Sequence, residues 1–145
     1  TIYAVGGVRI SPEIGEAGDV DTALCTLTFG NGVFVTIDNS RQAVFGYDQR
    51  VEAFGSGGMV RIDNNARTNA VLSTGKAVQR DLPLNFFMDR YIDSYIAELE
   101  AFIDAIERDA PTPVDGNDGR VPILMGYAAK KSLTEGRPVA LREIR

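Results

Sequence analysis

The feature that most constrains the fold is a pair of strand-like segments joined by a tight turn. Val20–Phe29 alternates small polar and apolar side chains over ten positions, the pattern of a half-buried strand. Gly30-Asn31-Gly32 follows, and glycine and asparagine tolerate the positive φ angles of hairpin turns. Val33–Asn39 then alternates in the same way. These residues predict a β-hairpin.

Similar runs precede and follow this hairpin, with loop residues at 11–18 and turn residues at 56–58. They are Ile2–Ile10, Arg50–Gly55, Met59–Ile62 and a short pair at Val71-Leu72 and Ala77-Val78. Because no helical pattern separates these strands, an antiparallel or mixed sheet is expected rather than βαβ units.

Helical patterns come last. Phe87–Arg108 carries apolar residues at helical spacing, and Pro111 and Pro113 prevent its continuation. A second helix is expected to be capped by Asp118, to hold Pro122 in its first turn and to run to Leu133. Gly136 and Pro138 would stop that helix, and Val139–Leu141 would form a last strand.

The predicted fold class is therefore α+β. We expect a large open-faced, mostly antiparallel (mixed) β-sheet with two C-terminal helices packed on one face, in a single domain spanning residues 1–145. Two helices cover only one face, and several strands are apolar on both alternations. The second face is expected to be an interface with another copy or domain, because an exposed apolar sheet of that size is unusual for a monomer.

Composition excludes several classes of function. The chain has no histidine, so it contains neither a Ser/His/Asp triad nor the commonest general base. A net charge of −5 without a basic run disfavours nucleic acid as a partner. No apolar run approaches the roughly 18 residues of a membrane span. Cys25 stands alone, which excludes a disulfide framework, predicts a packing thiol and favours a cytoplasmic location.

Glycine and aspartate clusters do not predict a cofactor or metal site. Two glycine clusters, Gly6-Gly7 and Gly55-Ser56-Gly57-Gly58, do not have the glycine spacing of a dinucleotide-binding motif, and no helical pattern follows either cluster. They are interpreted as turn or bulge residues. Asp115 and Asp118 lack the ligand spacing of a calcium loop, and helix capping is the preferred interpretation.

The best candidate site is the polar stretch Ile37–Met59, which lies between strand-like segments. Arg41 and Arg50 can hold carboxylates in a bidentate manner, and Tyr47 can hydrogen-bond a hydroxyl group. An ordinary polar turn is the competing interpretation. None of these residues is a catalytic nucleophile by itself, so the residues alone indicate a binding or assembly domain.

The stretch resembles the C-terminal domain of the Gfo/Idh/MocA oxidoreductase family, and most closely its myo-inositol 2-dehydrogenases. The similarity covers nearly the whole chain, and its central string is the specific one. The matching segments are DNSRQAVFGYDQRVEAFGSGGM (38–59), the opening strand at 2–7, GDVDTA (18–23), FFMDRYIDSYIAELEAF (86–102) and AAKKSLTEGRPV (128–139).

The resemblance implies an NAD-dependent (or NADP-dependent) dehydrogenase that oxidises a ring hydroxyl of a cyclic polyol. An N-terminal Rossmann domain, absent from this chain, would bind the cofactor and supply a lysine, and an upstream helix would supply an aspartate and a histidine. No catalytic, cofactor-binding or metal residue is then expected in this chain, which begins at Thr1 as a fragment would. Alone it is expected to be inactive and to bind no cofactor.

Residue by residue, the resemblance carries over one contact. The second aromatic residue of the family string, Tyr47, is expected to contribute to the polyol pocket. Asn39 and Arg41 are weaker candidates for the pocket, and a scaffold role is the preferred interpretation for both. The first aromatic position holds Phe45, where relatives often have tyrosine, so a hydroxyl contact is missing there.

The expected partners are a cyclic polyol or sugar and other copies of the chain, which would form a homo-oligomer through the open sheet face. Two alternatives stay open: an oxidoreductase of the same family that acts on a sugar or another polyol, and a stand-alone self-associating β-sheet module.

Overall fold

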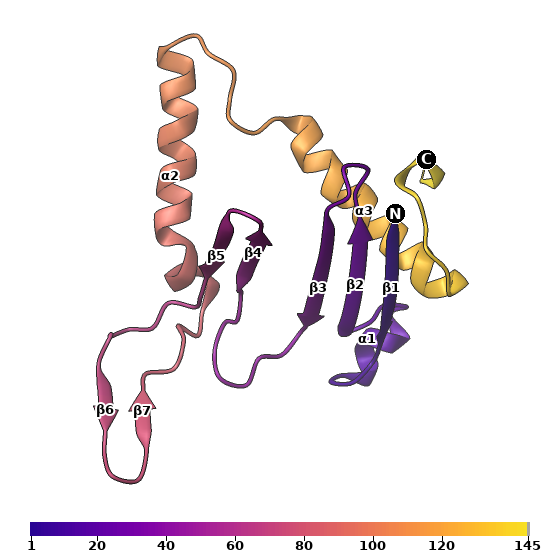
Figure 1. Cartoon of the computed structure of the whole chain (residues 1–145). Coiled ribbons are helices and arrows are strands. Elements are labelled where there is room, and N and C mark those ends of the chain that lie inside the picture. The colour runs from indigo at the N-terminus through magenta and orange to yellow at the C-terminus, as the bar shows by residue number, and fades with distance from the viewer. Residues whose placement is uncertain (145) are drawn as a thin grey trace. The chain divides into compact units, whose positions relative to one another are not determined.

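The computed structural model describes residues 1–144, which form two compact units. Unit 1 consists of Thr1–Gln42 and Pro113–Arg145, and unit 2 consists of Ala43–Thr112 (Figure 1). Unit 2 is therefore inserted in the sequence of unit 1.

Unit 1 contains a three-stranded antiparallel sheet in the order β1 (Ile2–Gly7), β2 (Thr22–Thr28) and β3 (Phe34–Ser40). The predicted hairpin is confirmed as β2 and β3, in a register that pairs Cys25 with Ile37. A loop was expected at 11–18, but a short helix, α1 (Pro12–Glu16), begins there. Proline at the first helical position already has the helical φ angle and lacks only an N–H that would be unpaired.

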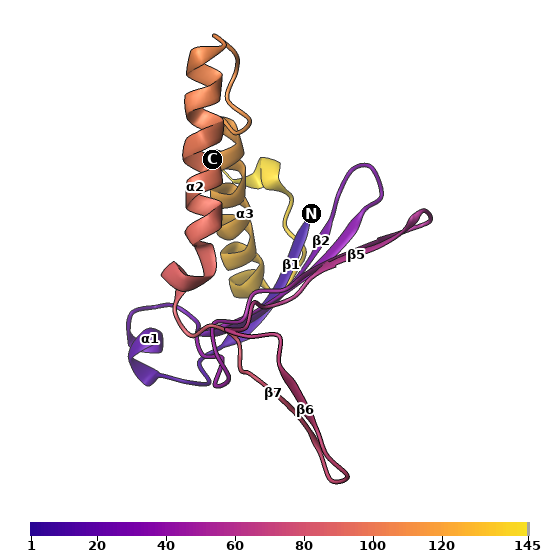
Figure 2. The same cartoon turned by 90° about the vertical axis from the view of Figure 1, so that its left-hand side faces the viewer.

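The core of unit 1 lies between this sheet and helix α3 (Gly116–Glu135), which runs beside β1 in both views (Figures 1 and 2). Ile2, Leu27, Ala128 and Val139 are its buried apolar members. The sheet supplies alternate residues of each strand, and the helix supplies a small side chain that permits close approach. Cys25 packs half-buried against this core, where burial raises the pKa of its thiol.

The prediction that Asp118 caps the second helix was wrong by three residues. Asp115 is the N-cap, and its carboxylate accepts hydrogen bonds from the backbone N–H groups of Asn117 and Asp118 at 2.7 and 3.1 Å. The Asp118 carboxylate instead accepts a hydrogen bond from the Asp115 N–H, which completes a capping box. Pro122 therefore lies inside the helix rather than in its first turn. Gly136, at φ 64°, ends the helix as predicted.

The segment after α3 returns to the sheet. Val139 forms an antiparallel bridge with Ile2, and the two backbone hydrogen bonds between them are each 2.8 Å long. The strand predicted at Val139–Leu141 is thus reduced to one bridging residue, because the chain turns into a 3₁₀ helix at Leu141–Glu143.

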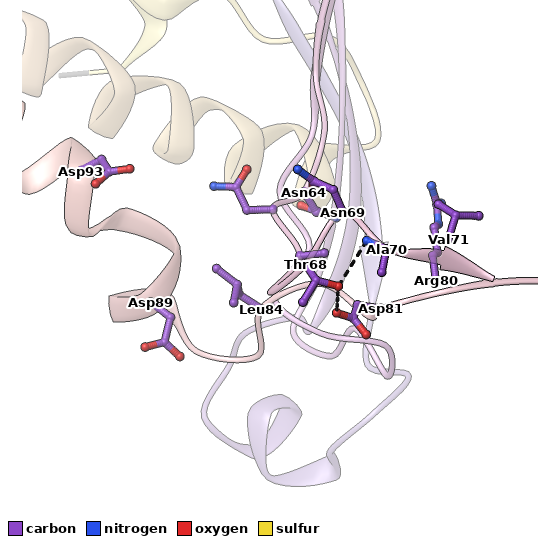
Figure 3. A pocket seen from close by; sticks show the side chains of 12 residues that line it. Asn64, Thr68, Asn69, Ala70, Val71, Arg80, Asp81, Leu84, Asp89 and Asp93 are labelled. Carbon is purple, nitrogen blue, oxygen red and sulfur yellow. Dashed lines mark hydrogen bonds between the residues drawn. The ribbon is translucent and has the colours of Figure 1, made fainter.

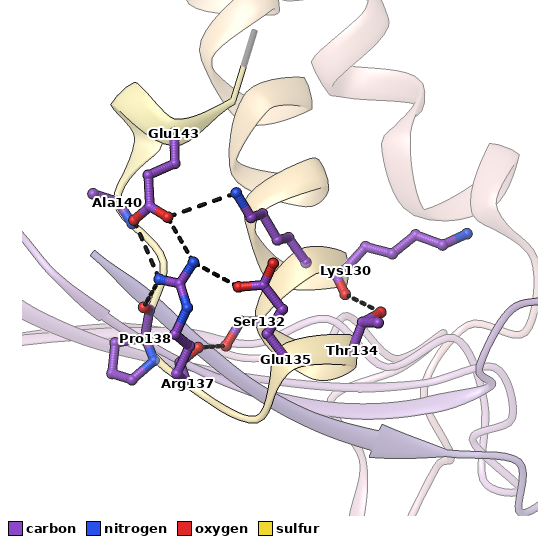
Figure 4. A network of polar contacts seen from close by, with 9 residues as sticks. Lys130, Ser132, Thr134, Glu135, Arg137, Pro138, Ala140 and Glu143 are labelled. Carbon is purple, nitrogen blue, oxygen red and sulfur yellow. Dashed lines mark hydrogen bonds and ion pairs between the residues drawn. The ribbon is translucent and has the colours of Figure 1, made fainter.

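A polar network fixes this C-terminal segment (Figure 4). Arg137 pairs with Glu143 at 2.8 Å and with Glu135 at 2.5 Å, and Lys131 lies 3.6 Å from Glu143. The hydrogen bond from Arg137 is the main reason that the pKa of Glu143 falls to about 2, and the Ala140 N–H contributes next. Beneath this network, the fully buried Ser132 hydroxyl accepts the Ala4 N–H at 3.0 Å and donates to the Arg137 carbonyl oxygen at 2.6 Å.

We expect Ser132→Ala to lower the free energy of unfolding by about 1–3 kcal/mol, because it leaves a buried N–H and a carbonyl oxygen without their partner. Thr134→Ala is the matched control: its exposed hydroxyl donates only to the Lys130 carbonyl of the same helix, so its effect is expected within about 0.5 kcal/mol. Urea denaturation of the two variants measures the difference, and equal stabilities would contradict this role for Ser132.

Unit 2 contains two hairpins and the long helix. The first hairpin pairs β4 (Val51–Gly55) with β5 (Gly58–Ile62), and the second pairs β6 (Val71–Ser73) with β7 (Val78–Arg80). Both were predicted, and every ladder is antiparallel, which confirms the α+β class. The strands nevertheless form three separate sheets among residues 1–144, not one continuous sheet.

Helix α2 (Phe87–Glu107) confirms the first helical prediction to within one residue. Its first turns contact the segment Tyr47–Gln49 through Arg90 and Tyr91. The apolar stripe predicted farther along the helix is exposed: Ile92, Ile96, Leu99, Phe102, Ile103 and Ile106 are each between 49 and 64% accessible. No helix of residues 1–144 combines the length and apolar character needed to cross a membrane.

The sheet of unit 1 also has an open face. Tyr3, Val5, Leu24 and Phe34 alternate in register with the core residues, and Phe34 is 74% exposed. α3 covers only the opposite face. The expectation of an uncovered apolar sheet face therefore agrees with the structure.

Candidate functional site

The loop that carries Tyr47 is built around a close backbone approach. Gly46 has φ 143°, and a Cβ atom at this position would lie 2.8 Å from the Pro83 carbonyl oxygen. The neighbouring Tyr47 N–H donates to the Leu84 carbonyl at 2.8 Å, and the Leu84 N–H donates to the Asn65 carbonyl at 2.9 Å. Glycine is needed here because any side chain would separate the two segments.

The Tyr47 ring packs edge-on against Tyr91 of α2, with ring centroids 5.8 Å apart and an interplanar angle of 86°. Burial raises the pKa of Tyr91, and a side-chain hydrogen bond with Tyr47 raises it further. The two rings therefore pack together, and Tyr47 keeps 37% of its surface exposed. Since a phenol both donates and accepts, Tyr47 retains capacity for a further hydroxyl group.

Asp48 anchors the next residues of the loop. Arg50 donates to both of its carboxylate oxygens at 2.8 Å, and the Asn64 side-chain amide donates to Oδ1 at 2.5 Å. These two hydrogen bonds, Arg50 first, lower the pKa of Asp48. Asp48 is thus a fixed acceptor within the loop. Arg50, predicted to hold a carboxylate, holds that of its own neighbour.

Asn39 and Arg41 belong to unit 1, whereas Tyr47 belongs to unit 2. Asn39 lies on β3 opposite Ala23, and Arg41 follows β3, where its backbone N–H donates to the Asp21 carbonyl at 2.9 Å. Both residues are exposed. Their binding roles, like that of Tyr47, remain predictions.

A polar cavity of about 530 Å³ lies within unit 2 (Figure 3). Asn64 and Leu84 line it, and these two residues also hold the Tyr47 loop. The ring of Tyr47 does not line it. The remaining lining residues are Asn65, Ala66, Thr68, Asn69, Ala70, Val71, Arg80, Asp81, Asp89 and Asp93.

Sequence reasoning missed two residues of this arrangement. Asn64 was assigned to a polar connection, and Tyr91 was left outside the predicted apolar stripe of α2. The local signal for Asn64 was an asparagine pair, Asn64-Asn65, that begins two residues after the end of a strand. Tyr91 is four residues before Tyr95, and their rings pack 6.4 Å apart, so tyrosine spacing was the signal for the second.

The described residues offer no metal centre or dinucleotide cradle. Among residues 1–144, no three histidine, cysteine, aspartate or glutamate side chains gather closely enough to hold an ion. Gly6-Gly7 lies within β1, and Gly55 and Gly58 close the β4–β5 hairpin, so none of these glycines opens a helix of the kind that binds a pyrophosphate.

Comparison with known proteins gives concordant results. A family model described as "Oxidoreductase family, C-terminal alpha/beta domain" matches residues 4–141. Myo-inositol 2-dehydrogenase of Thermotoga maritima is 48% identical over 99% of this chain and 43% of the relative, and inositol 2-dehydrogenase of Rhizobium meliloti is 38% identical over 97% and 43%.

Among solved structures, a probable dehydrogenase from Thermotoga maritima superimposes with a TM-score of 0.94 at 48% identity. The alignment covers 99% of this chain and 43% of that one. The chain thus spans less than half the length of the relatives it matches. It belongs to the Gfo/Idh/MocA oxidoreductase family and corresponds to the C-terminal alpha/beta domain of that family.

Proposed function

We propose that this chain is the substrate-side and oligomerisation domain of an NAD-dependent dehydrogenase that oxidises a ring hydroxyl of inositol or a related cyclic polyol. Its membership of the family and the names of its relatives support the substrate class. The main observation behind the proposed role of the domain is the Tyr47 loop. Its backbone is hydrogen-bonded to Leu84 and packed against Pro83, and it presents a phenol that is 37% exposed.

Tyr47 suits a polyol for chemical reasons. A cyclic polyol presents ring hydroxyl groups that both donate and accept, and a phenol matches either role without a change of charge. The edge-on packing against Tyr91 fixes the direction of the Tyr47 ring before a ligand arrives. Preorganisation of this kind reduces the entropy that binding would otherwise cost. In this proposal Tyr47 binds and orients the polyol and transfers no proton.

The chemical step belongs to residues outside this chain. NAD does not fit the glycines described above, so we assign no cofactor contact and derive no hydride-transfer step from the present residues. The domain would provide one wall of the polyol pocket. We further propose a cytoplasmic enzyme, in agreement with a single cysteine that packs against the core.

The open sheet faces support self-association. On the unit 1 sheet, Tyr3, Val5, Leu24 and Phe34 form an exposed apolar face, and on one face of β4–β5 the side chains of Val60 and Ile62 are 63% and 57% exposed. Contiguous apolar surface of this kind marks interaction sites in soluble proteins. We propose that these faces are covered in a homo-oligomer, and light scattering that shows a monomer would contradict this.

Tyr47→Phe tests the substrate role in the full-length enzyme that the proposal implies. Loss of one neutral hydrogen bond is expected to raise the KM for the polyol roughly three- to tenfold, with the KM for NAD nearly unchanged. Tyr127→Phe, which alters an exposed tyrosine of α3, is the matched control. Initial-rate kinetics with a panel of inositols and sugars measures the effect and identifies the preferred substrate. An unchanged KM for every active substrate would refute the role of Tyr47.

A further inference from the structure

Asn64 occupies an unusual position in unit 2. It follows β5, outside the loop that carries Tyr47, and its amide makes two hydrogen bonds to that loop. The Nδ2 group donates to Asp48 Oδ1 at 2.5 Å, and Oδ1 accepts the Gln49 N–H at 2.8 Å. The two bonds run in opposite directions, so a flipped amide would place donor against donor and acceptor against acceptor. This fixes the orientation of the Asn64 side chain.

The other contacts of the loop involve different atoms: the Tyr47 N–H donates to the Leu84 carbonyl, and the Tyr47 ring packs against Tyr91. Arg50 donates to both carboxylate oxygens of Asp48 from within the same loop, which stiffens the loop. Arg90 donates to the Gln49 carbonyl at 3.1 Å. Asn64 binds both the side chain of Asp48, which is the residue after Tyr47, and the adjoining backbone at Gln49.

We propose that Asn64 is a positioning residue for Tyr47, whose amide locks the Tyr47–Gln49 segment so that the Tyr47 ring stays against Tyr91 and its hydroxyl points toward the polyol. This inference rests on the proposed function of Tyr47. It assigns Asn64 no contact with the substrate, although Asn64 also lines the cavity of unit 2 (Figure 3).

A charge-swap experiment separates positioning from direct binding. Asn64→Asp keeps the shape and the acceptor for Gln49 but places a second carboxylate against Asp48. Adding Asp48→Asn restores a donor and an acceptor in the same pair. Asn65→Asp makes the same charge change one residue away, at a side chain with no hydrogen-bond partner among residues 1–144, and is the control.

In the full-length enzyme we expect Asn64→Asp to raise the KM for the polyol about tenfold, as for the loss of a charge-assisted hydrogen bond. The kcat is expected to stay within about twofold. The double variant should recover most of the parental KM, and Asn65→Asp should match the parent. A parental KM in Asn64→Asp, or a defect that Asp48→Asn does not relieve, would overturn the proposal; the second result would indicate direct contact with substrate or a wider structural loss.

A spectroscopic readout keeps the inference separate from the proposed function. This chain has five tyrosines and no tryptophan, so its near-UV circular dichroism reports tyrosine packing. Asn64→Asp should change the tyrosine band, Asp48→Asn should restore it, and the change should vanish in a Tyr47→Phe background. If Tyr47→Phe leaves the polyol KM unaltered, the proposed function fails while this band still decides the positioning role. A band that is unchanged by Asn64→Asp would refute it.

Discussion

Asp21→Ala is expected to destabilise unit 1 more than any other polar substitution there. Asp21 is 2% exposed, and its carboxylate accepts the backbone N–H groups of Arg9, Ile10 and Ser11 at 2.7, 2.8 and 3.0 Å and the Thr22 hydroxyl at 3.0 Å. Alanine leaves four donors without their acceptor at once. The turn between β1 and α1 depends on these bonds, so we expect it to open and the melting temperature to fall by several degrees.

The stabilisation by Asp21 should also depend on pH. Burial disfavours its charge, but the N–H groups of Ser11, Arg9 and Ile10 outweigh burial and lower the pKa from 3.8 to about 2. A carboxyl group whose pKa is lower in the folded state stabilises that state above its unfolded pKa. This contribution is lost as the pH falls from 3.8 toward about 2.

Urea denaturation across this pH range checks the prediction with Asp21→Asn, which keeps the shape but cannot ionise. The difference in free energy of unfolding between the parent and Asp21→Asn should be largest above pH 3.8 and should shrink as the pH approaches 2. Asp19→Asn, whose exposed carboxylate accepts only the Val20 N–H, is the control. A parent-to-variant difference that does not vary with pH would contradict the prediction.

Gly46→Ala is the second substitution with a large expected effect. At φ 143° an alanine is strained by about 1–3 kcal/mol, and its Cβ would also lie 2.8 Å from the Pro83 carbonyl oxygen, which is backbone and cannot rotate away. Relief requires separation of the Gly46–Tyr47 and Pro83–Leu84 segments. We therefore expect a loss of stability above the strain alone, together with a displaced Tyr47 ring.

Gly58 provides a matched control for Gly46. Its φ is 139°, yet a Cβ there would have no atom within 4 Å. Gly58→Ala consequently measures the backbone strain without the clash. Thermal unfolding and near-UV circular dichroism of the two variants should show the larger loss of stability, and the altered tyrosine signal, in Gly46→Ala. Equal losses with an unaltered tyrosine signal would show that the contact with Pro83 is unimportant.

The elements that the sequence predicts well are those whose partners lie close in the chain. The β2–β3 and β4–β5 hairpins form between neighbouring segments, and α2 carries its apolar periodicity within itself. The start of α3 was misplaced because Asp115 and Asp118 are both good capping residues. Only the backbone geometry shows that the two form one capping box.

Contacts between distant residues were not predictable in the same way. Ser132 hydrogen-bonds to Ala4, which is 128 positions away in the chain, and Asn64 hydrogen-bonds to Asp48, which is 16 positions away. No local pattern distinguishes Ser132 from its exposed neighbours, and the Asn64-Asn65 pair does not show which residue is the partner of Asn64. The division of the strands among three separate sheets is likewise a matter of long-range pairing. For the site, Tyr47 came from a family resemblance, and the structure adds the loop and the tyrosine partner that hold it.

The bridge between Ile2 and Val139 has a consequence for the order in which the protein forms during synthesis. Strand β1 leaves the ribosome before the rest of unit 1, but the residue that bridges to its edge is made 137 positions later. All of unit 2, Ala43–Thr112, emerges in the interval and can begin to fold on its own local contacts. Until α3 and Val139 arrive, the nascent β1–β3 sheet exposes both apolar faces and the unpaired edge of β1, a state in which edge-to-edge aggregation competes with folding.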